Sequence, residues 1–424
     1  MILLYIHISK GVAKMKLKAY LLKHRSFLLV CMMFACVYLG TGAYNPYITL
    51  FYQSKGLTTS QIGVISAIGP IATILLQTAW GTLADRTSRK GVLIFALIGS
   101  AMCAGMYLLG ASYLYILIIA LLYTIFNTAV LPMCDAMALD FCSHSGFRFA
   151  PIRMSGTIGY ALAGFLFGGL FSKDMNHVFP VYILFCALAV VAKLFYPTPK
   201  ASIREKVRTE KEQPRKKLSM LPLLRDPVVI FLLMSNFVVY IGASSYTYLA
   251  LYASELGFDD ALCGQLSSIA AAAEIPALLL IDRILEKIPA KKIILATCAL
   301  MAVRIFVTYI AGFCGKTSLL VLIFGQLMQA VTYIPCYYCA AKMIHERFPD
   351  ELKSTAQTLL ALVTTGLGRI LANLLGGYLS EPDVLGLQNT FLFFAVFIAL
   401  GTAAVFLCDR ALLRKEISSI QPKM

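Results

Sequence analysis

Residues 80–90 have the sequence Trp-Gly-Thr-Leu-Ala-Asp-Arg-Thr-Ser-Arg-Lys, a charged turn between two long apolar stretches. These stretches, at 60–83 and 91–110, are each long enough to cross a bilayer as a helix, which takes roughly 20 apolar residues. A charged turn that joins two such segments is typical of a helical hairpin in a membrane. The pattern predicts a membrane protein with more than one crossing.

The whole chain has the composition of such a protein. Of its 424 residues, 59% are hydrophobic and 14% are charged, whereas soluble domains contain about 25% charged residues. The mean hydropathy is +0.78. A soluble protein of this length needs more polar surface, so that class is excluded. The 12 cysteines lie mainly in apolar runs, where Cys behaves as a small hydrophobic side chain, and they predict no disulfide framework.

Twelve apolar stretches are long enough to span, and they fall into two sets of six on either side of one polar segment. We therefore expect an all-α integral membrane fold of twelve transmembrane helices in two six-helix bundles. The crossings are expected at 27–51, 60–83, 91–110, 113–139, 151–171, 179–196, 228–253, 262–281, 292–312, 318–341, 355–379 and 387–408. The expected units are a tail (1–26), a first bundle (27–196), a basic linker (197–226), a second bundle (227–408) and a second tail (409–424).

The positions of Lys and Arg predict the topology. The net charge is +16, and only Lys55, Lys173 and Lys316 fall in loops on the side opposite the linker. Because basic loops stay in the cytoplasm, we expect both termini on the cytoplasmic side. The excess charge is thereby explained without nucleic acid. No signal peptide pattern follows the basic start, and Met15 is a second candidate initiator.

The two halves are related by an internal repeat. Gly42-Ala43, followed by Tyr52, recurs 200 residues later as Gly242-Ala243, followed by Tyr252. Leu83-Ala84-Asp85-Arg86 likewise has a counterpart in Leu280-Ile281-Asp282-Arg283. Parallel repeats of this kind flank a central path in many transporters.

The turn at 80–90 resembles the loop between helices two and three of the major facilitator superfamily, whose pattern is Gly-x-Leu-Ala-Asp-Arg-x-Gly-Arg-Lys. The resemblance implies a cytoplasmic gate that stabilises the outward-open state. We expect Gly81 to permit close helix contact and the charges to form the latch. Ser88 replaces the usual glycine. The expected gate residues are Gly81, Asp85, Arg86, Arg89, Asp282 and Arg283.

Five charged residues inside the expected spans are candidates for a functional site: Asp135, Arg153, Glu274, Arg304 and Arg369. Each costs roughly 2.5–3.5 kcal/mol on insertion scales, so such residues are usually paired or face a cavity. We expect one acid–base pair in each half. A structural salt bridge is the simpler interpretation, and substrate and proton handling is the functional one.

Three further segments resemble the lactose permease group of sugar transporters: Gly42–Pro46, Pro132–Ala136 and Arg153–Tyr160. The resemblance implies that Asp135 and Arg153 bind sugar hydroxyls and that Tyr160 stacks on the sugar ring. The second half, with Ala273-Glu274-Ile275, Arg304 and Ser354–Gln357, is more similar to the nucleoside and phenylpropionate permeases. Polar side chains that we expect to line the path as well are Tyr44, Asn45, Gln77 and Gln329.

The proton-coupling site of that group cannot be transferred. Where the group has His-x-x-Glu on helix ten, this chain has Gln329 and Thr332. If protons are used, Glu274 is the first candidate carrier, since a carboxyl beside an arginine can exchange a proton for an ionic contact. The expected coupling set is Glu274, Arg304, Asp135 and Arg369.

No pattern indicates an enzyme. The five histidines are scattered, and there is no His-Glu-x-x-His and no nucleotide-binding loop. Cys336-x-x-Cys339 stands alone in an apolar stretch and predicts no metal site, and Gly164-x-x-x-Gly168 predicts close helix packing. No cofactor is expected.

We therefore expect a monomeric proton-coupled symporter in the lipid bilayer that imports a small polar solute, a saccharide or a nucleoside. The resemblance implies that this bilayer is the cell inner (plasma) membrane. A drug or metabolite exporter of the same superfamily is the alternative. A sensor that has kept the fold is a third class.

Overall fold

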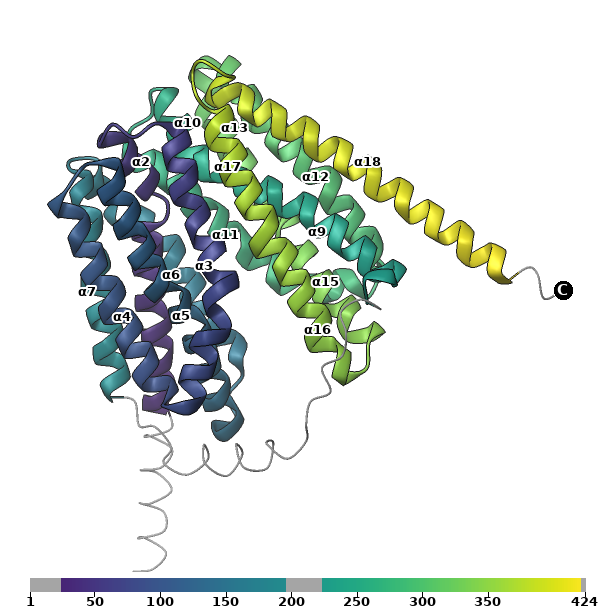
Figure 1. Ribbon diagram of the computed structural model, residues 1–424, viewed down its shortest axis with the longest axis horizontal. Helices are drawn as coiled ribbons and strands as arrows, with labels where there is room; N and C mark the ends of the chain where they lie inside the picture. Colours follow the sequence, from purple (N-terminus) through teal and green to yellow (C-terminus); the bar gives the residue numbers. More distant parts are fainter. Residues whose placement is uncertain (1–23, 196–222, 421–424) are drawn as a thin grey trace, which may run out of the picture.

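The computed structural model describes residues 24–195 and 223–420, and this part of the chain is helical without strands (Figure 1). Within it, eleven segments are long and apolar enough to cross a membrane. A twelfth long helix, α11 (Asp260–Leu285), is not among these eleven and carries Glu274 near its middle. The expected first tail and basic linker lie largely outside the described residues.

The first bundle follows the expected crossings closely. Its helices begin at capping residues: Thr58 forms a reciprocal capping box with Gln61, and the Ser88 hydroxyl accepts from the Gly91 N–H. The crossings are His24–Ser54, which ends in α2 (Ile48–Ser54), then α3 (Thr59–Arg86), α4 (Arg89–Met106), α5 (Tyr113–Ser145), α6 (Phe149–Phe171) and α7 (Val178–Phe195).

The second bundle departs from the expected continuous crossings. Its elements are α9 (Pro227–Ser245), α10 (Leu249–Glu255), α11, α12 (Ala290–Ile310), α13 (Ser318–Leu327), α14 (Gln329–Thr332), α15 (Ile334–Arg347), α16 (Asp350–Ala361), the π-helical segment η7 (Leu362–Gly368), α17 (Arg369–Leu379) and α18 (Gly386–Ile420). The crossing expected at 318–341 is present as one span, Gly315–Arg347, but its helix is interrupted around Met328 and Tyr333. Pro335 has no N–H to continue the helical bonds there. The crossing expected at 387–408 corresponds to the span Gly386–Arg410, and α18 continues beyond it to Ile420.

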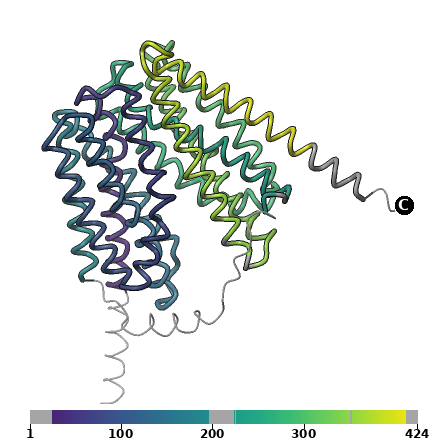
Figure 2. Tube along the Cα trace, viewed as in Figure 1, coloured from purple at the N-terminus to yellow at the C-terminus, as the bar shows by residue number. Residues whose placement is uncertain are grey.

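The two bundles lie side by side, meet at one face and diverge toward the other (Figures 1 and 2). We call the diverging face, where Phe195 and Leu223 lie, the linker face, and the opposite one, with the loops at 55–58 and 381–385, the distal face. Helix α3 packs on α17, and α6 packs on α11. These two pairs form the seam between the bundles.

Hydrogen bonds close the distal end of this seam. The Glu381 carboxylate accepts from the Ser60 N–H at 2.7 Å, and the Asn373 side-chain N–H₂ donates to the Ser66 carbonyl at 3.1 Å. The Tyr47 hydroxyl donates to the Ala261 carbonyl at 3.4 Å. Each bond joins a residue of one bundle to a residue of the other. The distal end is therefore the closed end.

Small residues permit this approach. A Cβ on Gly164 would lie 2.3 Å from Ser268 Oγ, and one on Gly168 would lie 2.9 Å from Tyr47 Oη. The close packing predicted for Gly164-x-x-x-Gly168 is thus confirmed, and it lies between bundles.

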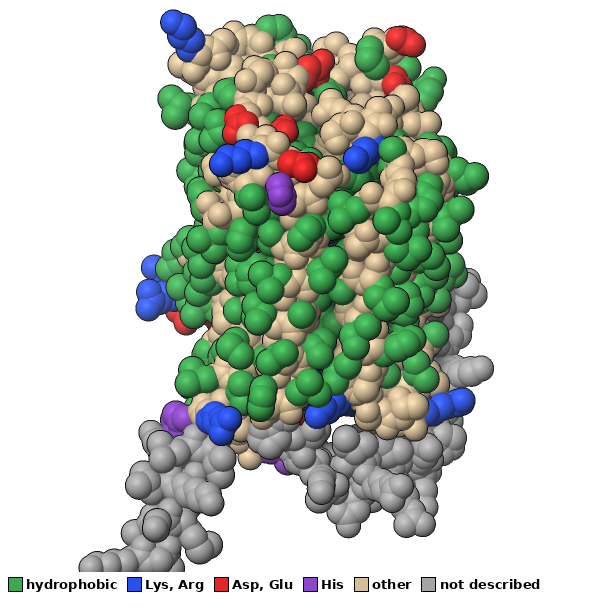
Figure 3. Space-filling model, turned by 90° about the vertical axis from the view of Figure 1, so that its left-hand side faces the viewer, with side chains coloured by type: hydrophobic (Ala, Val, Ile, Leu, Met, Phe, Trp, Pro, Cys, Tyr) green, Lys and Arg blue, Asp and Glu red, His purple; other side chains and the backbone are tan. Residues whose placement is uncertain are grey.

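On the face of the molecule shown in Figure 3, a wide band of hydrophobic side chains covers the middle, with charged side chains gathered largely toward the two ends. Large apolar side chains such as Leu75, Met102 and Leu166 are each more than 60% exposed. Exposed surface of this kind is stable in lipid rather than in water. The molecule is a multi-pass membrane protein.

Candidate functional site

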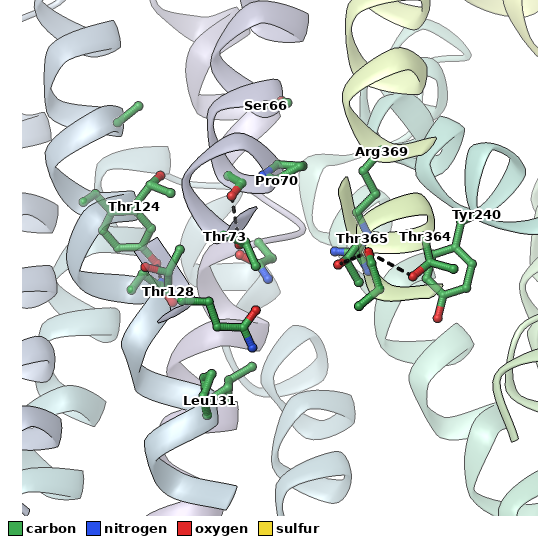
Figure 4. A pocket seen from close by; sticks show the side chains of 18 of the residues that line it. Ser66, Pro70, Thr73, Thr124, Thr128, Leu131, Tyr240, Thr364, Thr365 and Arg369 are labelled. Atoms are coloured by element: carbon green, nitrogen blue, oxygen red, sulfur yellow. Dashed lines mark hydrogen bonds between the residues drawn. The ribbon is translucent and has the colours of Figure 1, made fainter. Parts of the chain in front are cut away.

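A cavity of about 770 Å³ lies between the bundles, and we call it the main cavity. Side chains from α3 and α5 form one wall, and side chains from α9, η7 and α17 form the other (Figure 4). The walls combine aromatic rings with hydroxyl and amide groups, as small-molecule sites do. The polar lining side chains are Tyr44, Asn45, Tyr52, Ser66, Thr73, Gln77, Tyr107, Tyr123, Thr124, Asn127, Thr128, Asn236, Tyr240, Tyr337, Gln357, Thr364, Thr365 and Arg369.

Three residues expected on the path do line this cavity: Tyr44, Asn45 and Gln77. Tyr44 is only 4% exposed, and its ring stacks on Tyr123 at 4.6 Å between ring centres. Its hydroxyl donates to the Tyr107 hydroxyl at 3.3 Å. The main role of Tyr44 is therefore to hold the cavity wall.

Several lining residues were missed by the sequence reasoning. Thr124, Asn127 and Thr128 on α5, and Thr364 and Thr365 in η7, supply much of the polar surface. Their signal was available as a cluster of polar side chains within apolar crossings. That cluster indicates a cavity only when two helices that are distant in the sequence face each other.

A second cavity of about 280 Å³, the seam cavity, lies between α6 and α11. The predicted residues Arg153, Tyr160, Glu274, Arg304 and Gln329 all line it. Tertiary structure thus brings together charges from both halves of the sequence. The Arg153 guanidinium stacks over the Tyr38 ring, 4.7 Å from the ring centre, and its Nη1 has no hydrogen-bond partner among the described residues.

Arg304 is the centre of a buried polar network. It is 1% exposed, and its guanidinium lies 4.1 Å over the Tyr246 ring. It donates to four groups: the Gly325 carbonyl at 2.8 Å, Gln326 Oε1 at 3.2 Å, Thr332 Oγ1 at 3.3 Å and Gln329 Oε1. This number of bonds offsets the cost of burying its charge.

Gln329 connects this network to Glu274. Its amide N–H₂ donates to Glu274 Oε1 at 2.9 Å, while its carbonyl oxygen accepts from Arg304. The Gln329 amide therefore bridges Glu274 and Arg304, which are not in direct contact. The direct acid–base pair that we expected in this half is not formed in this conformation.

Asp135 is placed differently from expectation. It is not among the residues that line the main or seam cavity, and its Oδ1 is buried without a partner among the described residues. No ion pair joins Asp135 to Arg153 in the described part of the chain. The expected pair of the first half is thus absent here, because the arginine instead stacks on Tyr38.

Arg369 lines the main cavity and also a third cavity of about 430 Å³. This distal cavity lies between α3, α9 and α17, with Ser66, Ser244 and Asn373 in its wall. Gln329 lines both it and the seam cavity. Arg369 is therefore separated from Glu274 by Gln329.

The predicted gate residues lie on the linker face. Arg89 forms an ion pair with Asp140 of α5 at 2.5 Å, a partner that the sequence did not identify. Asp282 accepts from the Tyr338 hydroxyl at 2.6 Å. Asp85 and Arg86 are exposed. A Cβ on Gly81 would meet open space, so Gly81 makes no close helix contact in this conformation, in which the bundles diverge here.

A family model described as "MFS_1 like family" matches residues 28–393. The chain belongs to the MFS_1 like family. Its members are transporters of the major facilitator superfamily, which confirms the resemblance found in the turn at 80–90. The all-helical architecture agrees with this family.

Named relatives of this MFS_1 like protein are transporters. The chain is 26% identical to the maltose permease of Geobacillus stearothermophilus over 373 residues, which covers 88% of this chain and 91% of the relative. It is 23% identical over 354 residues to a probable 3-phenylpropionic acid transporter of Escherichia coli (strain K12), covering 80% and 87%. A crystal structure of the nucleoside transporter NupG superposes with a TM-score of 0.71 at 16% identity, covering 91% of this chain and 98% of that chain. That likeness shows a shared fold.

Proposed function

We propose that this protein is a proton-coupled symporter that imports a small polar organic solute, a saccharide or a nucleoside, by alternating access. The observation that carries the proposal is the Glu274–Gln329–Arg304 network, which faces Arg153 of the other bundle across the seam cavity. A charged network at the seam of two rocking bundles is placed to sense which face is open. The names of the relatives support maltose-like and nucleoside-like solutes.

The charge of the loops indicates which face of the molecule points toward the cytoplasm. If basic loops are cytoplasmic, the linker face and both termini face the cytoplasm of the inner membrane. The bonds at Ser60 and Asn373 then close the outside, and the main cavity opens inward. In this scheme the solute binds between the bundles, where Arg369 lines both the main and the distal cavity and Gln329 lines both the distal and the seam cavity. Arg153 and Tyr160 would contact it from the seam cavity.

Glu274 is the proposed proton carrier and Arg304 its electrostatic partner. When Glu274 is ionised, it accepts a hydrogen bond from Gln329, and the amide carbonyl faces the Arg304 cation. When Glu274 is protonated, it carries a donor of its own and the amide loses its charged acceptor. Protonation therefore changes the bonds at the seam, and the bundles can respond by moving. Arg369 lines other cavities, so we assign coupling to Glu274 and Arg304.

The test uses the purified full chain in proteoliposomes. We expect an inward proton gradient to drive accumulation of at least one labelled saccharide or nucleoside. Glu274→Gln should keep exchange of labelled for unlabelled solute and lose uphill accumulation, because exchange needs no net proton transfer. Glu255→Gln, on the distal face, is the matched control and should accumulate normally.

Two outcomes contradict the proposal. Unchanged accumulation in Glu274→Gln removes this residue from coupling. Solute leaving vesicles against its gradient when protons enter identifies an exporter, which is the alternative function.

A further inference from the structure

The wall around Arg369 contains no carboxylate among the described residues. The main cavity and the distal cavity are lined by hydroxyl, amide and aromatic side chains, with Arg369 as their charged lining residue. The seam cavity differs, since Arg153 and Arg304 share it with Glu274. The seam cavity therefore contains a carboxylate that can balance its arginines, whereas the linings of the main and distal cavities contain none.

Arg369 forms none of the ion pairs found in the described part of the chain. Its guanidinium lies 6.0 Å from the centre of the Tyr240 ring, a weak contact for a cation. Arg304 shows what this protein supplies for a structural arginine, namely four acceptors. Among the described residues no acceptor bonds the Arg369 guanidinium, and its side chain lies in the cavity wall (Figure 4). An anion satisfies the paired donors of such a guanidinium.

Threonine hydroxyl groups on both walls of the main cavity are arranged as acceptors: Thr364 and Thr365 lie on the wall of Arg369, and Thr73 and Thr128 lie on the opposite wall (Figure 4). Thr73, Thr128, Thr364 and Thr365 each donate their hydroxyl proton to a helix carbonyl of their own turn, at 2.9–3.0 Å. Their oxygens keep free lone pairs, which accept hydrogen bonds. Hydroxyl groups of a bound solute would supply the matching donors.

Asn373 adds a second feature at the same place. It lies one helical turn beyond Arg369, is 5% exposed, and lines the distal cavity. Its N–H₂ group bonds Ser66, but its Oδ1 is buried without a partner among the described residues. A buried acceptor without a donor is costly, and a solute hydroxyl at this position would satisfy it.

We propose that the substrate is a hydroxylated organic anion whose carboxylate or phosphate group pairs with Arg369, while its hydroxyl groups bond the threonines and Asn373. A sugar acid, a sugar phosphate and a nucleoside monophosphate have this chemistry. The inference rests on the proposed transport function and specifies the charge of its solute. Arg369 is thereby assigned to binding.

The experiment compares the binding of neutral solutes with the binding of their anionic derivatives, measured by thermal shift of the purified full chain. The pairs are glucose with glucuronate, glucose with glucose 6-phosphate, and uridine with uridine 5′-monophosphate. Binding raises the apparent melting temperature by mass action. We expect at least one anion to bind at least ten times more tightly than the neutral solute of its pair. The glucuronate pair tests recognition of a carboxylate, and the other two pairs test recognition of a phosphate.

Variants at Arg369 connect the preference to this side chain. Arg369→Gln should remove the preference for the anion, and Arg369→Lys should retain part of it. Arg410→Gln is the control, because Arg410 lies over Phe406 on α18 and lines none of these cavities. The melting temperature without ligand reports whether each variant folds.

The outcomes separate this inference from the transport function. Three results would overturn the inference. They are equal binding of the neutral and the anionic solute of each pair, a preference for the anion that persists in Arg369→Gln, and no change of melting temperature with any pair. Uphill accumulation of a neutral solute in proteoliposomes would overturn it while upholding the symporter. Anion binding lost in Arg369→Gln, without accumulation, would uphold it while contradicting the symporter.

Discussion

At the scale of single residues, the three buried or half-buried arginines show how context sets the role of one side chain. Arg304 is enclosed by acceptors, Arg153 stacks on Tyr38, and Arg369 faces open cavity. All three looked alike in the sequence, as charges within apolar stretches. Only the partners that the fold supplies separate a structural arginine from a binding one.

This difference predicts opposite responses to lysine. Arg304→Lys should lower the melting temperature clearly, because an ammonium cannot reach all four acceptors and each lost charged bond costs about 1.5–3 kcal/mol. Arg369→Lys should leave the ligand-free melting temperature nearly unchanged. The measurement is thermal unfolding of both variants in the same detergent. A larger loss in Arg369→Lys would contradict the structural role of Arg304.

Glu381 predicts a pH dependence of the distal closure. Its partial burial tends to raise the pKa of this carboxyl, but the Ser60 N–H and the neighbouring hydroxyls of Thr58, Ser60 and Thr59 outweigh burial and hold its pKa below the usual value. The stabilisation is therefore fully present above the ordinary carboxyl pKa of about 4.3, and it is lost as pH falls below it.

Acidification of the distal side should thus open that face in the wild type. The opening is measured as the rate of labelling by a reagent that does not cross the membrane. Glu381→Gln should be open more often at neutral pH and show a flatter pH profile. Asp383→Asn, in the same loop, is the control. An identical profile in Glu381→Gln and wild type would show that another group holds the closure.

At the scale of elements, the seam depends on which glycines of α6 face α11. Gly164 faces it, and Gly169, five residues later, is exposed with open space around its Cα. The sequence predicted close packing for a Gly-x-x-x-Gly pattern, but not that the partner helix belongs to the other half. Pairing across halves depends on the relative position of the bundles, which no local pattern contains.

Gly164→Val should therefore loosen the distal seam, while Gly169→Val should not. The readout is modification of native Cys263, which is fully buried beside Gly264 where that glycine packs on Tyr47 of the other bundle. We expect faster modification of Cys263 by a distal maleimide in Gly164→Val, detected by mass spectrometry. Equal rates in both variants would contradict a role of Gly164 in the closure.

At the scale of the whole molecule, the gate residues of the two bundles do not form a latch with each other in this conformation. The exposed Asp85 forms no ion pair found in the described residues, whereas Arg89 is bound to Asp140 within its own bundle. If the motif latches the bundles when the distal face opens, the loss of Asp85 should affect that other state alone.

Asp85→Asn should then slow solute exchange several-fold and leave the melting temperature of this conformation unchanged. Asp140→Asn should lower that melting temperature slightly, since an exposed pair contributes at most about 1 kcal/mol. The two variants are compared by exchange rates in proteoliposomes and by thermal unfolding. Normal exchange in Asp85→Asn would remove this residue from the latch.

The sequence by itself determined the class of protein, the positions of most crossings, the duplication and the charges within spans, because these depend on hydrophobic length and on local spacing. It also identified Glu274, Arg304 and Gln329 as candidate residues. The absence of an ion pair between Asp135 and Arg153 and the meeting of Arg153 with Glu274 were decided by tertiary structure. They depend on how the helices pack: Arg153 stacks on Tyr38 and shares the seam cavity with Glu274, and both of these residues lie more than 100 residues from it in the sequence.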